Sequence, residues 1–333
     1  MRETRWRSAV VGGLAFGLGL SAAMADEDNF NDAVELARAG DMAGARVLFE
    51  QAHADGDARA ANLLGEIHWF GKFGQGDPVT ACGYFQAGAA AGNAAAMHNL
   101  ANCYYLGEGR PQDYGQSRLW FEQAVASGMT SSLCALGDHY RRGLGVERDP
   151  VKAATLCRMG ASEGHADAQT DLAEMHIRGE GVTRDYGRAA DLLKLAAQNG
   201  QPNAMLFLGA LYRTGKGVEK DPREAGKWWG RAVSAGNRRA PYHLGELFFV
   251  HAGRDLEQGK VGRNLRAALF WLALAEEIDA DPAKREEAQR MLTLLSPNVP
   301  ADAVGQAEQD LEDWRQTSPV YAAWVRGEPR RAR

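Results

Sequence analysis

Two glycines separated by one residue could form the backbone cradle of a phosphate. Residues 136–153 read LGDHYRRGLGVERDPVKA, and Gly143 and Gly145 in this segment lie between an apolar stretch and a predicted helix. Backbone amides that carry no side chain can approach an anion closely, and such a loop would indicate a nucleotide-binding enzyme. Alternatively, the two glycines only let the chain turn sharply between helices, because glycine adopts positive φ without steric cost.

Histidine and serine are the other residue types that could support catalysis. No histidine lies in H-E-x-x-H or another metal-ligand spacing, and the sequence lacks the G-x-S-x-G pattern of a serine nucleophile. His68 and His176 occupy a column that is otherwise aromatic, so we expect them in the core. We therefore predict a protein that is not an enzyme and that uses no cofactor or metal. The eight histidines are His53, His68, His98, His139, His165, His176, His243 and His251.

A period of 36 residues organises most of the chain. The glycine pair, an aspartate after it and a glycine at the end of each unit all follow this spacing. Gly143 and Gly145 belong to the series, and the aspartate would oppose a bound phosphate, so we interpret them as a structural turn. A leucine followed by a small residue marks the period at Leu64-Gly65, Leu100-Ala101, Leu136-Gly137, Leu172-Ala173, Leu208-Gly209 and Leu244-Gly245.

Each period predicts two antiparallel helices, which we call helix A and helix B. Helix A carries apolar side chains four residues apart, such as Ala204, Leu208 and Tyr212, and ends at the glycines. The aspartate that follows caps helix B, and in several units a proline such as Pro150 fills the first helical position. Helix B buries a second apolar face and ends at the next glycine.

These motifs together resemble a known repeat family. The pattern A-x-x-x-L-G-x-x-Y-x-x-G-x-G-V-x-x-D, read from Ser132 onward, is similar to the Sel-one-like repeat (SLR), a relative of the tetratricopeptide repeat with a longer internal turn. The resemblance covers Asp57 to about Glu276. It implies an all-α, right-handed α-solenoid of antiparallel helix pairs. It also implies an adaptor that holds proteins or peptides, and exported bacterial members are tied to envelope assembly, exopolysaccharide control or host contact.

The segments around the regular repeats complete the predicted organisation. We expect a tetratricopeptide-like hairpin at 26–56, five SLR units at 57–236, a sixth unit at 237–278, capping helices at 279–317 and a flexible basic tail at 318–333. The sixth unit carries a six-residue insertion around His251 to Gly262, since Phe270-Trp271 follows Trp228-Trp229 by 42 residues. That insertion is either a binding loop or a loosened terminal unit.

The first 25 residues have the pattern of a cleaved secretory signal. Arginines at positions 2, 5 and 7 precede an apolar stretch at 9–20, and Ala23-Met24-Ala25 forms an A-x-A cleavage signature. An uncleaved anchor would need about 20 apolar residues to span a bilayer. We therefore predict cleavage after Ala25, a periplasmic or secreted protein, and no integral membrane segment after cleavage.

The charge of the chain constrains its partners. The formal net charge is −5, and the basic residues form no concentrated face, so we expect no nucleic-acid binding. The capping helices predicted after the sixth unit would limit self-assembly through the exposed ends of the array, so we expect a monomer.

Four cysteines allow three pairings. Cys82 on helix B of the first unit and Cys103 on helix A of the second are level about the turn at Gly92, and both face the core. We predict a disulfide between them, worth about 3 kcal/mol. Cys134 and Cys157 are also level about their turn, but helical phase directs Cys134 away from helix B, which makes this second disulfide the weaker prediction. No C-x-x-C supports a redox role.

The outward phases of helix A form the predicted partner-binding face. One column on it is mostly acidic, and its neighbour carries the aromatic and arginine side chains that are enriched at interface hot spots. We hypothesise that Trp69 and Tyr105 anchor a partner segment; the alternative is an ordinary solvated polar face. The predicted residues are Glu66, Trp69, Asn102, Tyr105, Asp138, Arg141, Glu174, Arg178, Arg213 and Glu246.

Two functions follow from the resemblance. The first is a non-enzymatic periplasmic adaptor that binds an envelope protein or peptide and acts in envelope or exopolysaccharide regulation. The alternative is a cell-wall protein that recognises peptidoglycan or β-lactams and has weak hydrolase activity, as implied by some disulfide-containing relatives. Those relatives repeat cysteines in each unit, and this sequence does not.

Overall fold

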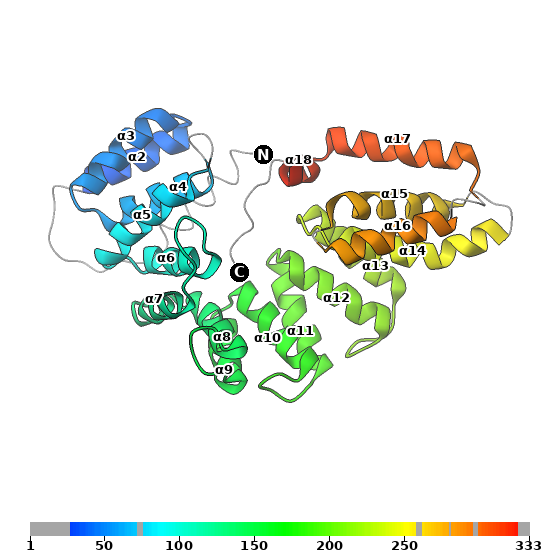
Figure 1. Cartoon of the computed structure of the whole chain (residues 1–333), viewed down its shortest axis with the longest axis horizontal. Coiled ribbons are helices and arrows are strands. Elements are labelled where there is room, and N and C mark those ends of the chain that lie inside the picture. Colours follow the sequence, from blue (N-terminus) through cyan, green and yellow to red (C-terminus); the bar gives the residue numbers. More distant parts are fainter. Residues whose placement is uncertain (1–26, 72–75, 258–261, 280, 296–298, 326–333) are drawn as a thin grey trace. The chain divides into compact units, whose positions relative to one another are not determined.

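The computed structural model describes residues 27–71, 76–257, 262–279, 281–295 and 299–325, and in these residues it forms 17 helices and no strand (Figure 1). The helices form two compact groups, α2–α8 in residues up to 149 and α9–α18 after it, which we call the N-terminal and C-terminal halves. Within each half, consecutive helices pack on one another, so the fold is the predicted α-solenoid. The helices are α2 Glu27–Ala39, α3 Met42–Ala54, α4 Ala58–Trp69, α5 Pro78–Ala90, α6 Ala94–Leu106, α7 Tyr114–Ala126, α8 Ser132–Arg142, α9 Pro150–Ser162, α10 Ala166–Arg178, α11 Tyr186–Gln198, α12 Pro202–Thr214, α13 Pro222–Ser234, α14 Ala240–Glu257, α15 Arg263–Ile278, α16 Pro282–Leu295, α17 Ala301–Thr317 and α18 Pro319–Val325.

The predicted aspartate caps start four of the B helices. The Asp77 carboxylate accepts the backbone amides of Val79 and Thr80, both at 3.1 Å, at the start of α5. Aspartates accept in the same way at the starts of α7, α11 and α13. These bonds satisfy amides that have no partner within the helix, which fixes where each B helix begins.

The second glycine of each turn also joins successive repeats. A Cβ on Gly109 would lie 2.1 Å from the carbonyl oxygen of Pro78, and one on Gly181 would lie 1.8 Å from that of Pro150. Both glycines have positive φ, at 75° and 69°. The turn between helices A and B therefore touches the start of the preceding B helix so closely that no side chain fits. The interpretation of these glycines as a structural turn is confirmed.

The Leu-Gly step has a packing reason as well. A Cβ on Gly65 would lie 2.4 Å from the Phe85 ring, and one on Gly209 would lie 2.4 Å from the Trp229 indole. The missing side chain leaves room for the aromatic residue of helix B, whose indole in the fifth repeat also donates to the Leu206 carbonyl at 3.1 Å. Phe85 and Trp229 are 3% and 1% exposed and lie in the cores of the two halves.

The cysteines are all oxidised in the structure. Cys82 and Cys103 form a disulfide between α5 and α6, with their Cα atoms 6.2 Å apart. Cys134 and Cys157 are also disulfide-bonded, and no cysteine of the chain is free. The prediction that helical phase directs Cys134 away from helix B is wrong, because Cys134 is disulfide-bonded to Cys157 on α9, which is helix B of the same unit.

The C-terminal part differs from the prediction in two places. Part of the predicted insertion lengthens α14 to 18 residues, whereas α12 has 13. The prediction of a flexible tail is wrong for residues 319–325, which form α18 on the C-terminal half. The Trp324 indole donates to the Gly236 carbonyl at 3.0 Å and is 8% exposed, because a large aromatic ring with one donor is stabilised by burial. Residues 326–333 and the predicted signal at 1–25 lie outside the described residues.

Candidate partner-binding face

The A helices of the N-terminal half are joined at the predicted face by a tyrosine, a carboxylate and an arginine. The Tyr105 hydroxyl on α6 donates to Asp138 on α8 at 2.8 Å, and Nη1 of Arg142 donates to the Tyr105 oxygen at 2.6 Å. Asp138 also pairs with Arg141, and with Arg142 at 3.3 Å. A side chain at this position of one A helix therefore reaches the next A helix.

The electrostatics of this cluster favour its ionic form. Burial opposes the charge of Asp138, but the hydrogen bond from Tyr105 and the two guanidiniums outweigh it and lower the pKa of the carboxyl. Burial and the Asp138 charge together raise the pKa of Tyr105 to about 12, so its hydroxyl stays protonated and donates. The Asp138 carboxylate thus accepts hydrogen bonds from three side chains of its own chain, those of Tyr105, Arg141 and Arg142.

The C-terminal half contains the equivalent link. Arg213 on α12 pairs with Glu246 on α14, and Nδ1 of His243 lies 3.8 Å from the same carboxylate. A hydrogen bond from His243, together with Arg213, lowers the pKa of Glu246 to about 2 against the cost of its burial. Glu174 is paired within its own helix, with Arg178 at 2.5 Å.

Glu66 has amide donors instead of a cation. Nδ2 of Asn62 donates to its carboxylate at 2.9 Å, and Nδ2 of Asn99 on the next A helix lies at 3.5 Å and also donates to Asn62 at 2.9 Å. Burial raises the pKa of Glu66, and the two amide bonds oppose this effect. Asn62 and Asn99 were not among the predicted residues, although their offset of 37 residues, close to the repeat period, could have shown that they face each other.

Several residues of the two predicted columns are paired with one another or buried rather than free on the surface. Tyr105 and Asp138 join α6 to α8, and Arg213 and Glu246 join α12 to α14. Arg141 pairs with Asp138, and Glu174 with Arg178, within one helix, so much of the charge on this face already has a partner in the chain. Asn102 was expected to face outward, but it is 7% exposed, because helix A is packed on more than one side. Trp69 is partly buried, with its ring 6.3 Å from that of Phe85.

Two exposed apolar residues lie beside these columns and were not among the predicted residues. Phe70, directly after α4, is 45% exposed, and Leu106, at the end of α6, is 37% exposed. They are 36 residues apart and each precedes the first glycine of its turn, so they hold the same position in successive repeats. The 36-residue period could have revealed them, but they lie at the helix ends, where the phase of a side chain is hardest to predict.

One serine–histidine pair in the N-terminal half is fully buried. Ser117 Oγ lies 3.1 Å from His139 Nε2, and His139 Nδ1 lies 2.9 Å from the Leu144 carbonyl oxygen. This resembles a nucleophile with its base, but both residues are 0% exposed and no substrate could reach them. Burial lowers the pKa of His139, so the ring is held neutral as a core residue. His176 is similarly buried, with Nδ1 3.1 Å from the Thr183 carbonyl oxygen.

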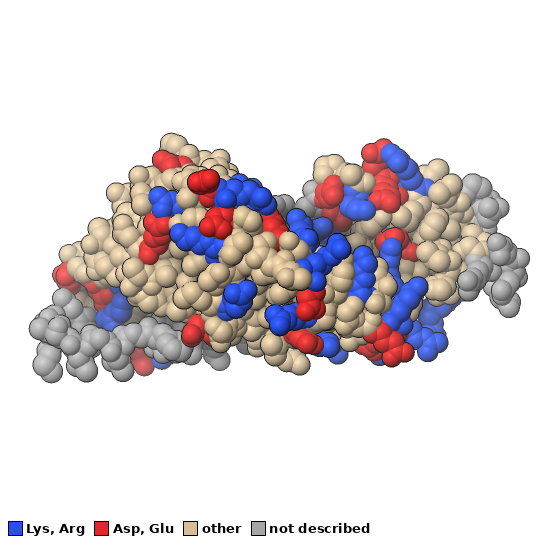
Figure 2. All heavy atoms as spheres, turned by 90° about the horizontal axis from the view of Figure 1, so that it is seen from below, with Lys and Arg blue, Asp and Glu red and all other residues tan. Residues whose placement is uncertain are grey.

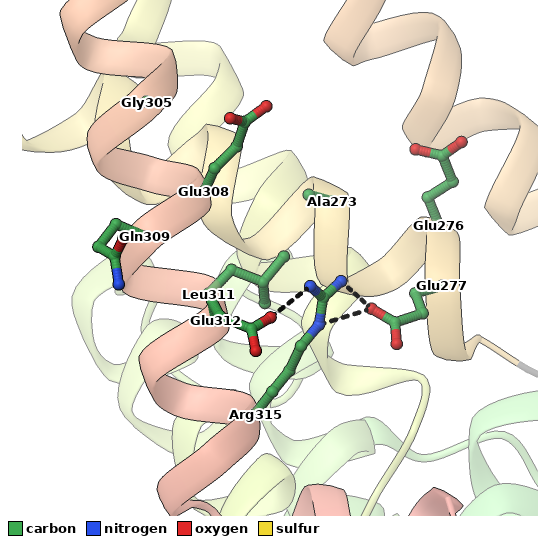
Figure 3. Close-up of a pocket in the computed structure, with 9 residues that line it drawn as sticks. All are labelled: Ala273, Glu276, Glu277, Gly305, Glu308, Gln309, Leu311, Glu312 and Arg315. Carbon is green, nitrogen blue, oxygen red and sulfur yellow. Dashed lines mark hydrogen bonds and ion pairs between the residues drawn. The ribbon is translucent and has the colours of Figure 1, made fainter.

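A hollow of about 790 Å³ lies between α15 and α17 (Figure 3). Arg315 bridges two of the four glutamates that line it, with Glu277 at 2.5 Å and Glu312 at 3.2 Å. Figure 3 shows Glu276 and Glu308 pointing away from this bridge. In the described parts of the chain, no three histidine, cysteine or carboxylate side chains are grouped so that they could hold a metal ion.

The surface carries both signs of charge. Figure 2 shows lysine and arginine interspersed with aspartate and glutamate over the visible face. Among the described helices, none combines the length and apolar character needed to cross a membrane.

Stacked antiparallel helix pairs with glycine turns define an α-solenoid repeat protein. The family model for the Sel1 repeat matches six segments of the chain, and the chain therefore belongs to the Sel1 repeat family. The expected resemblance is confirmed. The matched segments are residues 58–93, 94–129, 130–165, 166–201, 202–237 and 242–277.

Solved structures show the same fold. A Sel1 repeat protein from Oxalobacter formigenes has a TM-score of 0.64 and 24% sequence identity, covering 77% of this chain and 99% of that one. A protective antigen of uropathogenic Escherichia coli strains, described as displaying an SLR fold, has a TM-score of 0.54 and 19% identity, covering 92% of this chain and 87% of that one. No curated protein matches the chain.

Proposed function

We propose that the protein is a non-enzymatic scaffold that binds a protein or peptide partner on the exposed face of its A helices. The observation that carries this proposal is the pair Phe70 and Leu106, which are exposed at equivalent positions of successive repeats, next to the Tyr105–Asp138 bond that joins α6 to α8. A preorganised face that exposes large apolar side chains loses little conformational entropy when a partner binds.

The proposed location is the periplasm or the cell exterior. The absence of free cysteines supports this location, because disulfides persist in oxidising compartments. The basic and apolar start of the sequence, with its A-x-A signature, supports export as well. We propose that its partner is an envelope protein and that the pair acts in envelope or exopolysaccharide regulation.

The test is affinity capture of the protein beginning at Asp26 from cross-linked periplasm, followed by mass spectrometry. We expect one enriched envelope protein, retained by the wild type and lost with the double variant Trp69→Ala, Phe70→Ser. The matched control is Leu119→Ser, because Leu119 on α7 of the same half is 42% exposed but lies on a B helix. Capture that survives the A-helix variant and fails with the control would place binding elsewhere, and recovery of glycan fragments alone would contradict the proposal.

A further inference from the structure

We propose that four polar side chains on α4 and α6 form an amide patch that binds the main chain of an extended segment of the partner. The side chains pair with N–H and C=O groups of that segment, so the patch recognises an extended conformation rather than one particular sequence. This inference rests on the proposed function and names the part of the partner that the A helices bind. The residues of the amide patch are Asn62, Glu66, Asn99 and Asn102.

Three of these side chains are held together across the boundary between two repeats. Nδ2 of Asn99 on α6 donates to Oδ1 of Asn62 on α4 at 2.9 Å, and the same nitrogen lies 3.5 Å from the Glu66 carboxylate. Nδ2 of Asn62 donates to that carboxylate at 2.9 Å. A side-chain amide has two N–H donors and an oxygen with two lone pairs. These bonds therefore leave one N–H of Asn62 and the Oδ1 atom of Asn99 for a ligand.

The fourth residue, Asn102, lies midway between the two sides of α6 that contact the neighbouring A helices. Asn99 bonds to α4 and Tyr105 bonds to α8, and Asn102 is three residues from each. At 3.6 residues per turn, Asn102 is also nearly opposite Leu100, which is fully buried in the core. Asn102 thus lies on the side of α6 away from the core, one helical turn from Asn99.

Asn102 is a buried amide without a partner. It is 7% exposed, yet within the described residues its side chain forms no hydrogen bond. The polar atoms that are both enclosed and unpaired there are others, such as Gln169 Oε1 and Asp279 Oδ2, so the Asn102 amide is still open to solvent. Nearly all buried polar groups in proteins are hydrogen-bonded, so an amide in this position indicates a group that a ligand satisfies.

Other repeats place a charge at this position and pair it within the chain. The equivalent carboxylates on α8, α10 and α14 each bind an arginine, whereas Asn102 is neutral. An uncharged side chain that offers one donor group and one acceptor suits a ligand that is also uncharged and offers both. The equivalent carboxylates are those of Asp138, Glu174 and Glu246.

An extended main chain has this chemistry. The N–H and C=O groups of one residue in an extended chain point to the same side, which is how paired antiparallel strands exchange two hydrogen bonds. A side-chain amide can form the same two bonds with that residue. Packed helices lie about 8–10 Å apart and an extended chain rises about 3.3 Å per residue, so about three residues span α4 and α6. One segment can therefore contact Asn62 and Asn102 together.

The residues of the patch do not fit a charged polymer. The amide patch contains one ionisable group, Glu66, and no cation, whereas a nucleic-acid backbone or an anionic membrane is bound by many cations. Beyond the patch, Asp138 on α8 is paired with Arg141 and Arg142. A glycan also offers donors and acceptors, and it is the competing ligand in the test.

The experiment selects binders from a displayed library of random peptides on the wild-type protein. The best binder is then synthesised in a series in which one peptide nitrogen at a time is methylated. We expect methylation at one or two positions to weaken binding roughly tenfold, because each lost N–H removes a hydrogen bond. With Asn102→Leu, the unmethylated peptide should bind more weakly, and methylation at one of those positions should have little further effect.

The variants are chosen so that lost stability does not mimic the result. Asn102→Leu keeps a similar side-chain volume and removes an unpaired amide, so it should not lower the melting temperature. Asn102→Ala replaces it if its circular dichroism spectrum changes. The control Asn199→Ala should leave binding and the methylation pattern unchanged, because Asn199 is exposed at the end of the B helix α11.

The outcomes separate this inference from the scaffold function. Equal effects of methylation on the wild type and on Asn102→Leu overturn the inference, and the scaffold function stands if binding is still lost with Trp69→Ala, Phe70→Ser. Binding that no A-helix variant affects contradicts both. Selection of no peptide, with binding of glycan fragments alone, also contradicts both.

Discussion

The Tyr105 hydroxyl donates to the Asp138 carboxylate across the boundary between two repeats, at 2.8 Å. The same oxygen accepts from Arg142, so one tyrosine orders both the anion and the cation of the neighbouring helix. The bond thus stabilises the stack of repeats and also positions the face that we propose binds a partner.

Replacing Tyr105 with phenylalanine tests the structural half of this role. The change removes one donor from a largely buried carboxylate, and we expect the free energy of unfolding to fall by about 1.5–3 kcal/mol. Urea denaturation at pH 7 measures it. Tyr104→Phe is the matched control, because the Tyr104 ring packs under the Arg110 guanidinium rather than against a carboxylate. Equal losses in both variants would mean that the Asp138 bond contributes nothing.

The second prediction concerns the turn glycines. Gly181→Ala places a Cβ in a positive-φ position and against the Pro150 carbonyl, so we expect a loss of roughly 3 kcal/mol or more. Gly230→Ala is the opposite case, since a Cβ there meets nothing within 4 Å on a regular helix. It should stabilise the protein by about 0.5–1 kcal/mol. Thermal unfolding of the two variants would contradict the packing argument if Gly181→Ala were the milder change.

The third prediction concerns the disulfide between α5 and α6. Cys82→Ala with Cys103→Ala should lower the free energy of unfolding by about 3 kcal/mol, because the bond closes a loop of 21 residues in the unfolded chain. Denaturation with and without a reductant separates this bond from the other cysteines. Titration of the non-reduced protein with a thiol reagent should detect no free thiol, and two reactive thiols assigned to Cys82 and Cys103 would contradict the structure.

The fourth prediction is a loss of stability in weak acid. Burial lowers the pKa of His98 from 6.5 to about 4, and its ring is bonded to Ser132 at 2.8 Å. The unfolded chain therefore binds a proton before the folded protein does. Stability is complete above pH 6.5 and falls as the pH is lowered toward 4, by about 2 kcal/mol at pH 5 for this residue.

Comparison of urea unfolding at pH 7 and pH 5 checks this expectation. His98→Asn should flatten the dependence, and asparagine is the residue that holds the same position in the first repeat, at Asn62. The carboxylates Asp138 and Glu246 have pKa values lowered from 3.8 and 4.5, so their contribution to stability is lost mainly below these values and changes little between pH 7 and pH 5. An unchanged pH dependence in the variant would rule out His98 as the source.

The sequence predicts the fold well because its strongest signals are local. Three local features determine the repeat: a glycine with positive φ, an aspartate at a helix start and a small residue beneath an aromatic ring. Each acts within one repeat or between neighbouring repeats, and each recurs with the period, which makes the pattern easy to recognise. The candidate face is predicted less well. Helical phase identifies Tyr105 and Asp138 as outward residues. It does not show whether each of them already forms a hydrogen bond with a side chain from the next helix.

The sequence by itself determined the family, the helix pairs, the turns and the Cys82–Cys103 pairing, because each depends on residues close in the chain or exactly one repeat apart. Only the tertiary structure decided that Asn102 is buried, that Asp138 and Glu246 are already paired, and that Phe70 and Leu106 are exposed. It also showed that residues 319–325 fold back as α18. These features depend on which side chains reach across between helices, and side-chain length and burial settle that only once the helices are packed.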